Sequence, residues 1–170
     1  MKKGEKAMKP SEKLKLELYH WLAKNLLIDS MPTIYIDSKF YYDKVDRSIT
    51  LGWDIEREDL PEAFNNWLLR HGLVWGNLPY PMLAFLHEVG HYKTLDSIPC
   101  NDMYITWWIK GILAYHRENE DIDLYWNTPD EYAANMWLIN FANNHEEAIN
   151  ELGNIFCNYW NDAIEEVTRA

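Results

Sequence analysis

Apolar positions along the chain follow helical spacing, except in one short region near the first third. Within residues 11–28 apolar side chains recur every three or four positions, which predicts an amphipathic first helix that Ser11 can cap. Met31-Pro32 ends this helix, and β-type residues then dominate three short segments, namely 33–36, 40–42 and 48–53. Residues 43–47 are predicted as a turn between the second and third segments. We therefore predict a small, largely antiparallel three-stranded sheet with at least one open edge strand.

Helical spacing returns after the sheet and continues to the end of the chain. The predicted helices cover residues 61–70, 79–93, 102–116, 128–143 and 146–167. The helix over 79–93 is apolar at most positions, which is typical of a core helix, and the helix over 102–116 is rich in aromatic residues. The pattern predicts an α+β fold that is mainly helical, with the sheet placed ahead of the helix over 79–93.

Composition narrows the class of protein. The 170 residues are 48% hydrophobic and 15% aromatic, enough for one domain with a full core. Lysines concentrate at the start of the chain, so we predict a flexible basic N-terminus over residues 1–10 and a single domain over 11–170. The formal net charge of −11 makes the remainder acidic, and an acidic body repels phosphate backbones, so no nucleic-acid partner is expected.

Cysteine usage and hydropathy exclude further classes. The two cysteines, Cys100 and Cys157, are too far apart in sequence to suggest a disulfide scaffold or a thiolate zinc site. No run of about 18 apolar residues and no leader-like segment occurs, so no membrane partner is expected. These features predict a cytoplasmic protein.

The segment His87-Glu88-Val89-Gly90-His91 carries the strongest chemical signal in the sequence. On a helix the two histidines lie one turn apart on the same face, so both imidazoles can bind one zinc ion. Glu88 lies beside that face, where it can act as a general base toward water activated by the metal. Glycine is unfavourable in the interior of a helix, so its presence at position 90 needs another reason. We predict that another backbone packs closely against Gly90.

A catalytic zinc usually has three protein ligands, and Glu131 is the leading candidate for the third. On a helix Glu131, Ala134 and Asn135 share one face, where alanine permits close approach and Asn135 can hydrogen-bond to a metal ligand. Thr128-Pro129-Asp130-Glu131 also fits a capping box, in which Glu131 would cap the helix and bind no metal. The remaining alternatives for the third ligand are Asp96, His116 and Asp130.

These residues resemble the gluzincins, zinc peptidases with HExxH on one helix and a glutamate ligand on a later one. The closest resemblance is to the small ImmA/IrrE-type metallopeptidases and minigluzincins, in which an E-x-E-A-N segment matches Glu131, Ala134 and Asn135, with Ala133 replacing the second glutamate. The resemblance covers two short blocks. It implies a small sheet ahead of the motif helix and an edge strand that pairs with an extended protein or peptide substrate.

The interval from His91 to Glu131 is longer than in those compact peptidases and contains the predicted aromatic helix. Either this helix is an insertion that roofs the cleft, or Glu131 is not the ligand.

The sequence thus predicts a zinc-dependent endopeptidase that hydrolyses a peptide bond in a protein substrate. His87, His91 and Glu131 would bind the metal, Glu88 would be the general base, and one more donor would stabilise the carbonyl oxygen. Candidates for that donor are Tyr92, Tyr104, Tyr115, His116, Tyr125 and His145. The alternative is a non-catalytic protein-binding module that retains a metallopeptidase-like fold. Glu88 favours the enzyme, because a structural zinc site needs no base.

Overall fold

The computed structural model describes residues 7–26, 30–55, 57–94, 102–117 and 121–170, and the side chains of 102–104 lie outside this description. Within these residues, helices and a small sheet alternate in the order α1 (Pro10–Leu26), β1 (Thr33–Asp37), β2 (Tyr41–Asp43), β3 (Ser48–Gly52), α2 (Leu60–Arg70), α3 (Tyr80–Thr94), α4 (Asp102–His116), α5 (Asp123–Trp126), α6 (Pro129–Asn144) and α7 (Glu146–Arg169). Each predicted helix is present, and the mainly helical α+β class is confirmed. The short helix α5 was missed, because four residues are too few to show helical spacing.

The N-terminal boundary differs slightly from the prediction. Pro10 begins α1, where its missing N–H group and fixed φ suit a first helical turn, so Ser11 lies inside the helix and does not cap it. The backbone N–H group of Ser11 donates to Glu166 Oε2 of α7 at 3.0 Å. Most of the N-terminus predicted to be flexible lies outside the described residues.

The sheet is mixed, which corrects the prediction of a largely antiparallel one. Its strand order is β1-β3-β2, with β1 parallel and β2 antiparallel to β3. The turn between β2 and β3 makes an antiparallel hairpin, and the short connection from β1 to β2 reverses the chain once more. Two reversals give β3 the direction of β1, so these neighbours can pair only in parallel. Both β1 and β2 are edge strands.

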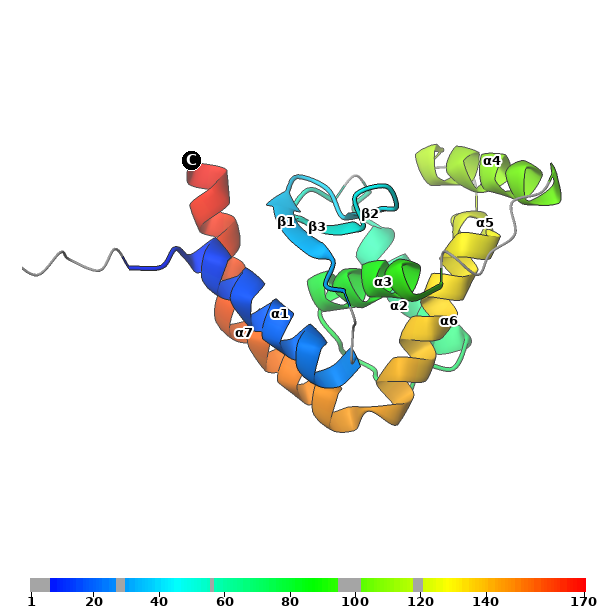
Figure 1. Ribbon diagram of the computed structural model, residues 1–170. Coiled ribbons are helices and arrows are strands. Elements are labelled where there is room, and N and C mark those ends of the chain that lie inside the picture. Colours follow the sequence, from blue (N-terminus) through cyan, green and yellow to red (C-terminus); the bar gives the residue numbers. More distant parts are fainter. Residues whose placement is uncertain (1–6, 27–29, 56, 95–101, 118–120) are drawn as a thin grey trace, which may run out of the picture.

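Two helix pairs and the sheet build the body of the molecule (Figure 1). α1 runs along α7, α3 runs beside α6, and the sheet lies on α3. Trp21 of α1 joins the pairs, because its ring packs edge-to-face on Phe85 of α3 and Phe141 of α6 while its Nε1 donates to the Ala148 carbonyl oxygen at 2.8 Å. None of the helices in the described ranges combines the length and apolar character needed to cross a membrane. The body therefore holds α3 centrally, in contact with the sheet on one side and α6 on another.

Gly90 is the point of closest approach between α3 and α6. A Cβ atom at this position would lie 2.5 Å from the Ala134 carbonyl oxygen and 2.9 Å from Ala134 Cα. Ala134 is itself fully buried. The prediction that Gly90 admits another backbone is therefore confirmed, and the small residues at both positions let the two helices approach.

Gly90→Ala is expected to reduce stability, because the new methyl group would push α6 away from α3. Overpacking costs about 1–3 kcal/mol, whereas the better helix propensity of alanine returns at most about 1 kcal/mol. Chemical denaturation would measure the change in the free energy of unfolding. Gly153→Ala in α7 is the matched control, because its Cβ would have only Met82 Sδ near it, at 4.0 Å. If both variants gained stability, the tight contact at Gly90 would be refuted.

Candidate metal centre

Helix α3 buries the whole His-Glu-x-x-His motif. His87, Glu88 and His91 are only 8%, 6% and 8% exposed, although each has a polar side chain. Their potential ligand atoms all lie within 4.8 Å of one another, so the three residues form a group that can hold a metal ion. The spacing of one helical turn brings the two imidazoles together, with Nε2 of His91 3.0 Å from Nε2 of His87.

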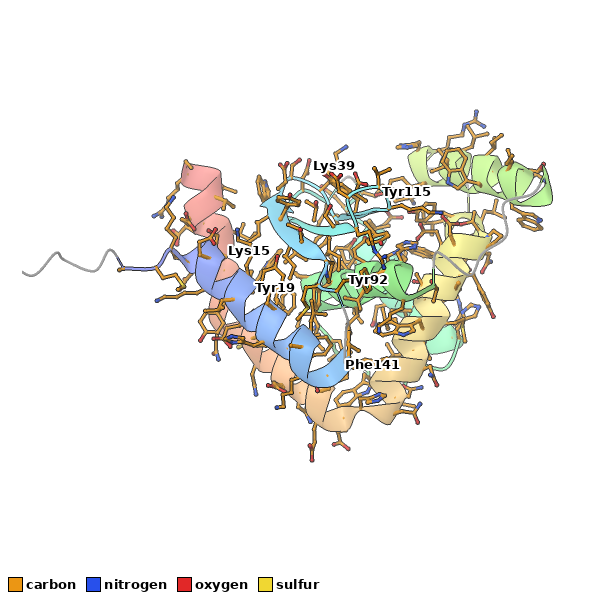
Figure 2. The ribbon with its side chains drawn as sticks, viewed as in Figure 1. Lys15, Tyr19, Lys39, Tyr92, Tyr115 and Phe141 are labelled. Atoms are coloured by element: carbon orange, nitrogen blue, oxygen red, sulfur yellow. The ribbon has the colours of Figure 1, made fainter. Side chains whose placement is uncertain are left out.

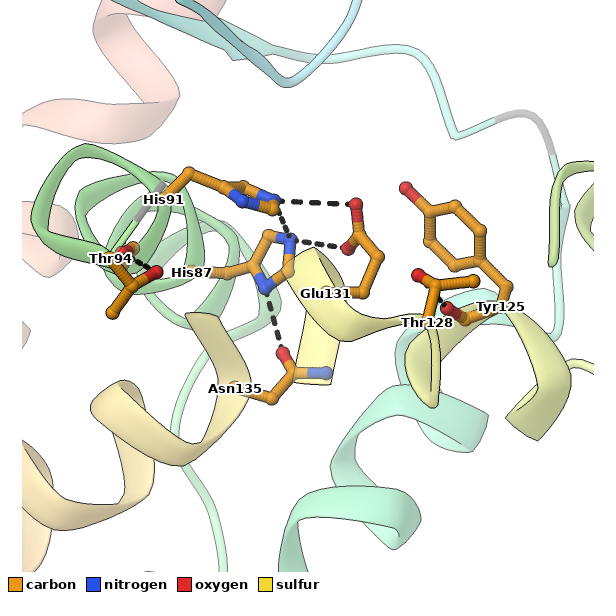
Figure 3. A network of polar contacts seen from close by, with 8 residues as sticks. His87, His91, Thr94, Tyr125, Thr128, Glu131 and Asn135 are labelled. Carbon is orange, nitrogen blue, oxygen red and sulfur yellow. Dashed lines mark hydrogen bonds and ion pairs between the residues drawn. The ribbon is translucent and has the colours of Figure 1, made fainter. Parts of the chain in front are cut away.

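Glu131 of α6 closes this group from the opposite side (Figure 3). Its Oε2 atom lies 2.9 Å from Nε2 of His87, and its Oε1 atom lies 3.3 Å from Nε2 of His91. The carboxylate is buried with the imidazoles, being 7% exposed as a residue. Two nitrogens and one carboxylate thus converge from two helices that Gly90 and Ala134 hold close together.

The capping-box interpretation of Glu131 does not fit this arrangement. The Thr128 backbone N–H group donates to the Tyr125 carbonyl oxygen at 3.1 Å, and the Thr128 hydroxyl donates to the same oxygen at 2.8 Å. The Thr128 side chain makes no capping hydrogen bond to the first turn of α6. Glu131 instead directs its carboxylate at the histidines.

Asn135 fixes the orientation of the first imidazole. Its Oδ1 atom lies 2.7 Å from Nδ1 of His87, and it is fully buried. An amide oxygen only accepts hydrogen bonds, so Nδ1 of His87 is the donor and the proton of the neutral ring lies there. Nε2 is then left with a lone pair directed at Glu131 and His91, as a metal ligand requires.

The charges of the group are strongly coupled. Burial alone would raise the pKa of Glu131, but the imidazoles of His91 and His87 beside it lower that pKa below its ordinary value. Burial alone would likewise lower the pKa of His91, whereas the Glu131 carboxylate raises it. The site therefore favours a carboxylate facing a positive charge, whether the charge is a proton on an imidazole or a cation between the ligands.

Glu88 has a different environment from Glu131. Burial raises the pKa of Glu88 most, His87 lowers it and the Glu131 carboxylate raises it, and together they bring this pKa to about 7. A carboxyl group with a pKa near neutrality can both accept and release a proton at physiological pH. Two glutamates in one site thus have opposite pKa shifts, a pattern typical of a division between binding and proton transfer.

A cavity of about 190 Å³ lies directly over the group and opens toward the sheet. It is lined by Phe40, Tyr41, Tyr42, His87, Glu88, His91, Tyr125, Asp130 and Glu131. We call it the ligand cavity. Because Tyr41 and Tyr42 belong to the edge strand β2, the cavity borders an open strand edge.

Tyr125 stands out among the six candidate donors for the carbonyl oxygen. It lies on α5, and its hydroxyl group points toward the Glu131 carboxylate (Figure 3). Burial raises the pKa of its phenol well above the ordinary value, with Glu131 and Glu88 adding to the effect, so the hydroxyl stays protonated and remains a hydrogen-bond donor. The sequence did not select it, because the four-residue α5 shows no periodicity.

The other candidates for this donor whose side chains the structure describes do not line the ligand cavity. The hydroxyl of Tyr92 donates to the Ser30 carbonyl oxygen, and Nδ1 of His145 lies 2.8 Å from the Phe141 carbonyl oxygen. Tyr115 and His116 line a second cavity. The side chain of Tyr104 lies outside the described residues.

The alternative candidates for the third metal ligand differ from Glu131 in their positions. Asp130 lines the ligand cavity and its charge helps to raise the pKa of His91, but the ion pairs found among the described residues join the imidazole nitrogens to Glu131. His116 faces the second cavity, and Asp96 lies outside the described residues.

The donor atoms are close enough together to hold one metal ion. For comparison, zinc–nitrogen and zinc–oxygen bonds of about 2.0–2.2 Å place tetrahedral ligand atoms about 3.3–3.6 Å apart. The three separations here are 2.9, 3.0 and 3.3 Å. Glu131 Oε2 is buried, yet no hydrogen-bond donor in the described residues is aligned with it. A cation between the two imidazoles and Glu131 would satisfy this oxygen and the facing nitrogen lone pairs.

Comparison of the chain with protein-family models, with curated proteins and with solved structures finds no significant match.

Proposed function

We propose that this protein is a zinc-dependent peptidase of the gluzincin type, in which His87, His91 and Glu131 bind zinc and Glu88 is the general base. The observation that carries the proposal is the contact of one buried carboxylate, from Glu131, with Nε2 atoms of both motif histidines at 2.9 and 3.3 Å. A pair of histidines on one helix is common, but a carboxylate from a second helix completes the ligand set of a catalytic zinc.

Bound at these residues, zinc would supply Lewis-acid chemistry, polarising a carbonyl group and lowering the pKa of water to about 7. Glu88 lines both cavities, so its carboxylate borders the space that a substrate peptide bond can enter. Glu88 would take a proton from the attacking water and pass it to the leaving amine. Asn135 would keep the His87 ring in the tautomer with a free Nε2 lone pair.

Substrate binding follows from the position of β2. This strand is at the edge of the sheet, and residues Tyr41 and Tyr42 line the ligand cavity. An extended peptide that pairs with the free edge of β2 would run past Glu88, with main-chain hydrogen bonds giving affinity. The proposed substrate is therefore a protein or peptide segment in an extended conformation.

The test uses zinc-loaded and metal-free protein with β-casein, a protein that is accessible because it is largely unfolded. We expect new peptides in the mass spectrum with the zinc-loaded protein, none with the metal-free protein, and recovery when zinc is added back. A protein that binds about one zinc per chain but cleaves neither β-casein nor a synthetic peptide library would support the alternative, a non-catalytic binding module.

Tyr125→Phe is expected to lower kcat by up to about 100-fold, because it removes a hydroxyl that would donate to the carbonyl oxygen as negative charge develops there. Zinc affinity should change little, since the phenol is not one of the three ligands. Steady-state kinetics with a cleaved library peptide would measure the effect. Tyr132→Phe on the exposed side of α6 is the matched control and should leave kcat unchanged. Equal kcat values for the two variants would remove Tyr125 from the mechanism.

A further inference from the structure

A second cavity, of about 260 Å³, adjoins the site at His87 and Glu88 and extends away from the other ligands. Its lining is dominated by rings from five elements or their connections, namely Phe40, Phe64, Tyr80, Tyr115, Tyr125 and Trp126. We call it the aromatic cavity. The two cavities share Glu88, so a peptide bond beside this carboxylate would have one neighbouring side chain in reach of the aromatic cavity.

The size of the aromatic cavity suits a large apolar side chain. An apolar protein cavity of about 150 Å³ holds benzene. The aromatic cavity is larger, and Phe64 and Trp126 in its lining are almost fully buried, at 4% and 3% exposure. Lys39 and Asp54 also line the cavity, and the buried rings offer packing that a small side chain would leave unused.

Helix α4 forms one wall of this cavity through Ile112, Tyr115 and His116. The C-terminal end of α4 lies toward the sheet, and Tyr115 is at that end (Figure 2). The N-terminal half of α4 points away from the body (Figure 1). One helix thus belongs partly to the site and partly to the outer surface.

The wall continues outward as an exposed apolar surface. Ile105, Trp108 and Ile109 precede Ile112 at helical intervals of seven, four and three residues, so all four lie on one face of α4. Three of them are large apolar residues with high exposure, Ile105 at 46%, Trp108 at 45% and Ile109 at 49%. We call these four residues the apolar face of α4. Because Ile112 lines the aromatic cavity, the face leads directly out of it.

The position of α4 is fixed by a close contact. A Cβ atom on Gly111 would lie 2.3 Å from Thr128 Cγ2 and 3.2 Å from Tyr125 Cα. Gly111 therefore seats α4 on the segment that carries Tyr125 and leads into Glu131. The apolar face is held in a defined position relative to the catalytic residues.

We propose that α4 is the substrate-recognition helix of this enzyme. A large apolar side chain next to the cleaved bond occupies the aromatic cavity, and the apolar residues that follow it in the substrate lie along the apolar face of α4. The substrate class is accordingly a protein segment with several consecutive apolar residues on one side of the cleavage site. This inference rests on the proposed peptidase function.

The experiment maps cleavage sites in a library of synthetic peptides by mass spectrometry, using zinc-loaded protein. We expect an enrichment of about tenfold or more for Phe, Tyr, Trp, Leu or Met at one position flanking the cut. Weaker enrichment of apolar residues is expected at the next positions on the same side. The double variant Trp108→Ser/Ile109→Ser should lose the outer enrichment.

Two variants that fill the aromatic cavity from different walls, Ala84→Phe in α3 and Ile112→Trp in α4, should lose the flanking preference for large side chains by about tenfold or more. Circular dichroism would establish that each variant is folded. Ala23→Leu on the exposed side of α1 is the control for an added apolar group and should keep every preference.

A second readout does not depend on catalysis. N-acetyl-L-phenylalaninamide added to metal-free protein should shift the indole N–H resonance of Trp126, and Ala84→Phe should abolish the shift. Cleavage of the library without any preference for apolar residues would overturn the inference while leaving the peptidase intact. If the wild-type protein cleaves no peptide, the proposed function fails, and the absence of a Trp126 shift would then overturn the aromatic cavity as a binding site.

Discussion

Glu88→Gln is expected to retain zinc and to lose about 100- to 10,000-fold in kcat, the largest catalytic effect of any single substitution outside the metal ligands. The amide has the shape of the carboxylate but cannot accept the proton of the attacking water. A Glu88 carboxylate oxygen lies within 4.8 Å of the imidazole nitrogens, whereas Glu131 oxygens lie closer to them, at 2.9 and 3.3 Å, so Glu131 is the expected ligand. Kinetics with a cleaved library peptide, together with zinc analysis of the same sample, would measure both quantities.

The control for this variant is Glu147→Gln, which makes the same chemical change at an exposed position in the first turn of α7. It should have wild-type kcat. Full activity in Glu88→Gln would mean that another group is the base, and loss of zinc in Glu88→Gln would mean that Glu88 is a ligand.

Glu131→Ala is expected to weaken zinc binding by at least about 100-fold, and activity should fall with the metal. Removing groups that only support a zinc ligand lowers affinity by about 10- to 100-fold, so loss of a direct ligand should exceed that range. The two buried histidines would remain 3.0 Å apart without the carboxylate that contacts both of them. Competition with a fluorescent zinc chelator would measure the affinity.

A helix-capping role for Glu131 predicts a different outcome. Loss of a cap costs about 1 kcal/mol of stability and leaves the metal bound. Glu147→Ala removes a first-turn glutamate from α7 and isolates the effect of losing a negative charge near a helix N-terminus. Unchanged zinc affinity in Glu131→Ala, with a small loss of stability equal to that of Glu147→Ala, would support the cap and contradict the metal site.

Much of the fold follows from local patterns. The predicted helices match α1, α2, α3, α4, α6 and α7 because each carries apolar residues at helical spacing over at least three turns. The strands were also located from a local pattern, namely short runs of β-type residues. The parallel pairing of β1 with β3 was not predictable, since strand order depends on which edge of the β2–β3 hairpin the earlier strand joins.

The motif residues of the site were predictable because helical geometry alone brings His87 and His91 together. Bringing Glu131 to them needs a second helix, and the sequence left its role open between ligand and cap. Gly90 and Ala134 were the available signal, since two small residues permit the close contact of α3 and α6 that delivers the carboxylate.

Two parts of the site were beyond the sequence. Tyr125 lies on a helix of four residues, too short for any periodic pattern, and its place beside Glu131 depends on how α5 leads into α6. Helix α4 was predicted as an element, but its apolar residues equally suit a core helix. Only the structure shows that half of it lies outside the body and that Ile112 faces the aromatic cavity.

The central claim is that one zinc ion binds between His87, His91 and Glu131. Anomalous diffraction from crystals of the zinc-loaded protein, recorded above and below the zinc absorption edge, tests it most directly. The account predicts one strong peak per chain, about 2.0–2.2 Å from Nε2 of His87, Nε2 of His91 and a carboxylate oxygen of Glu131. A zinc peak at other residues, or zinc held by the two histidines with Glu131 turned away, would contradict it.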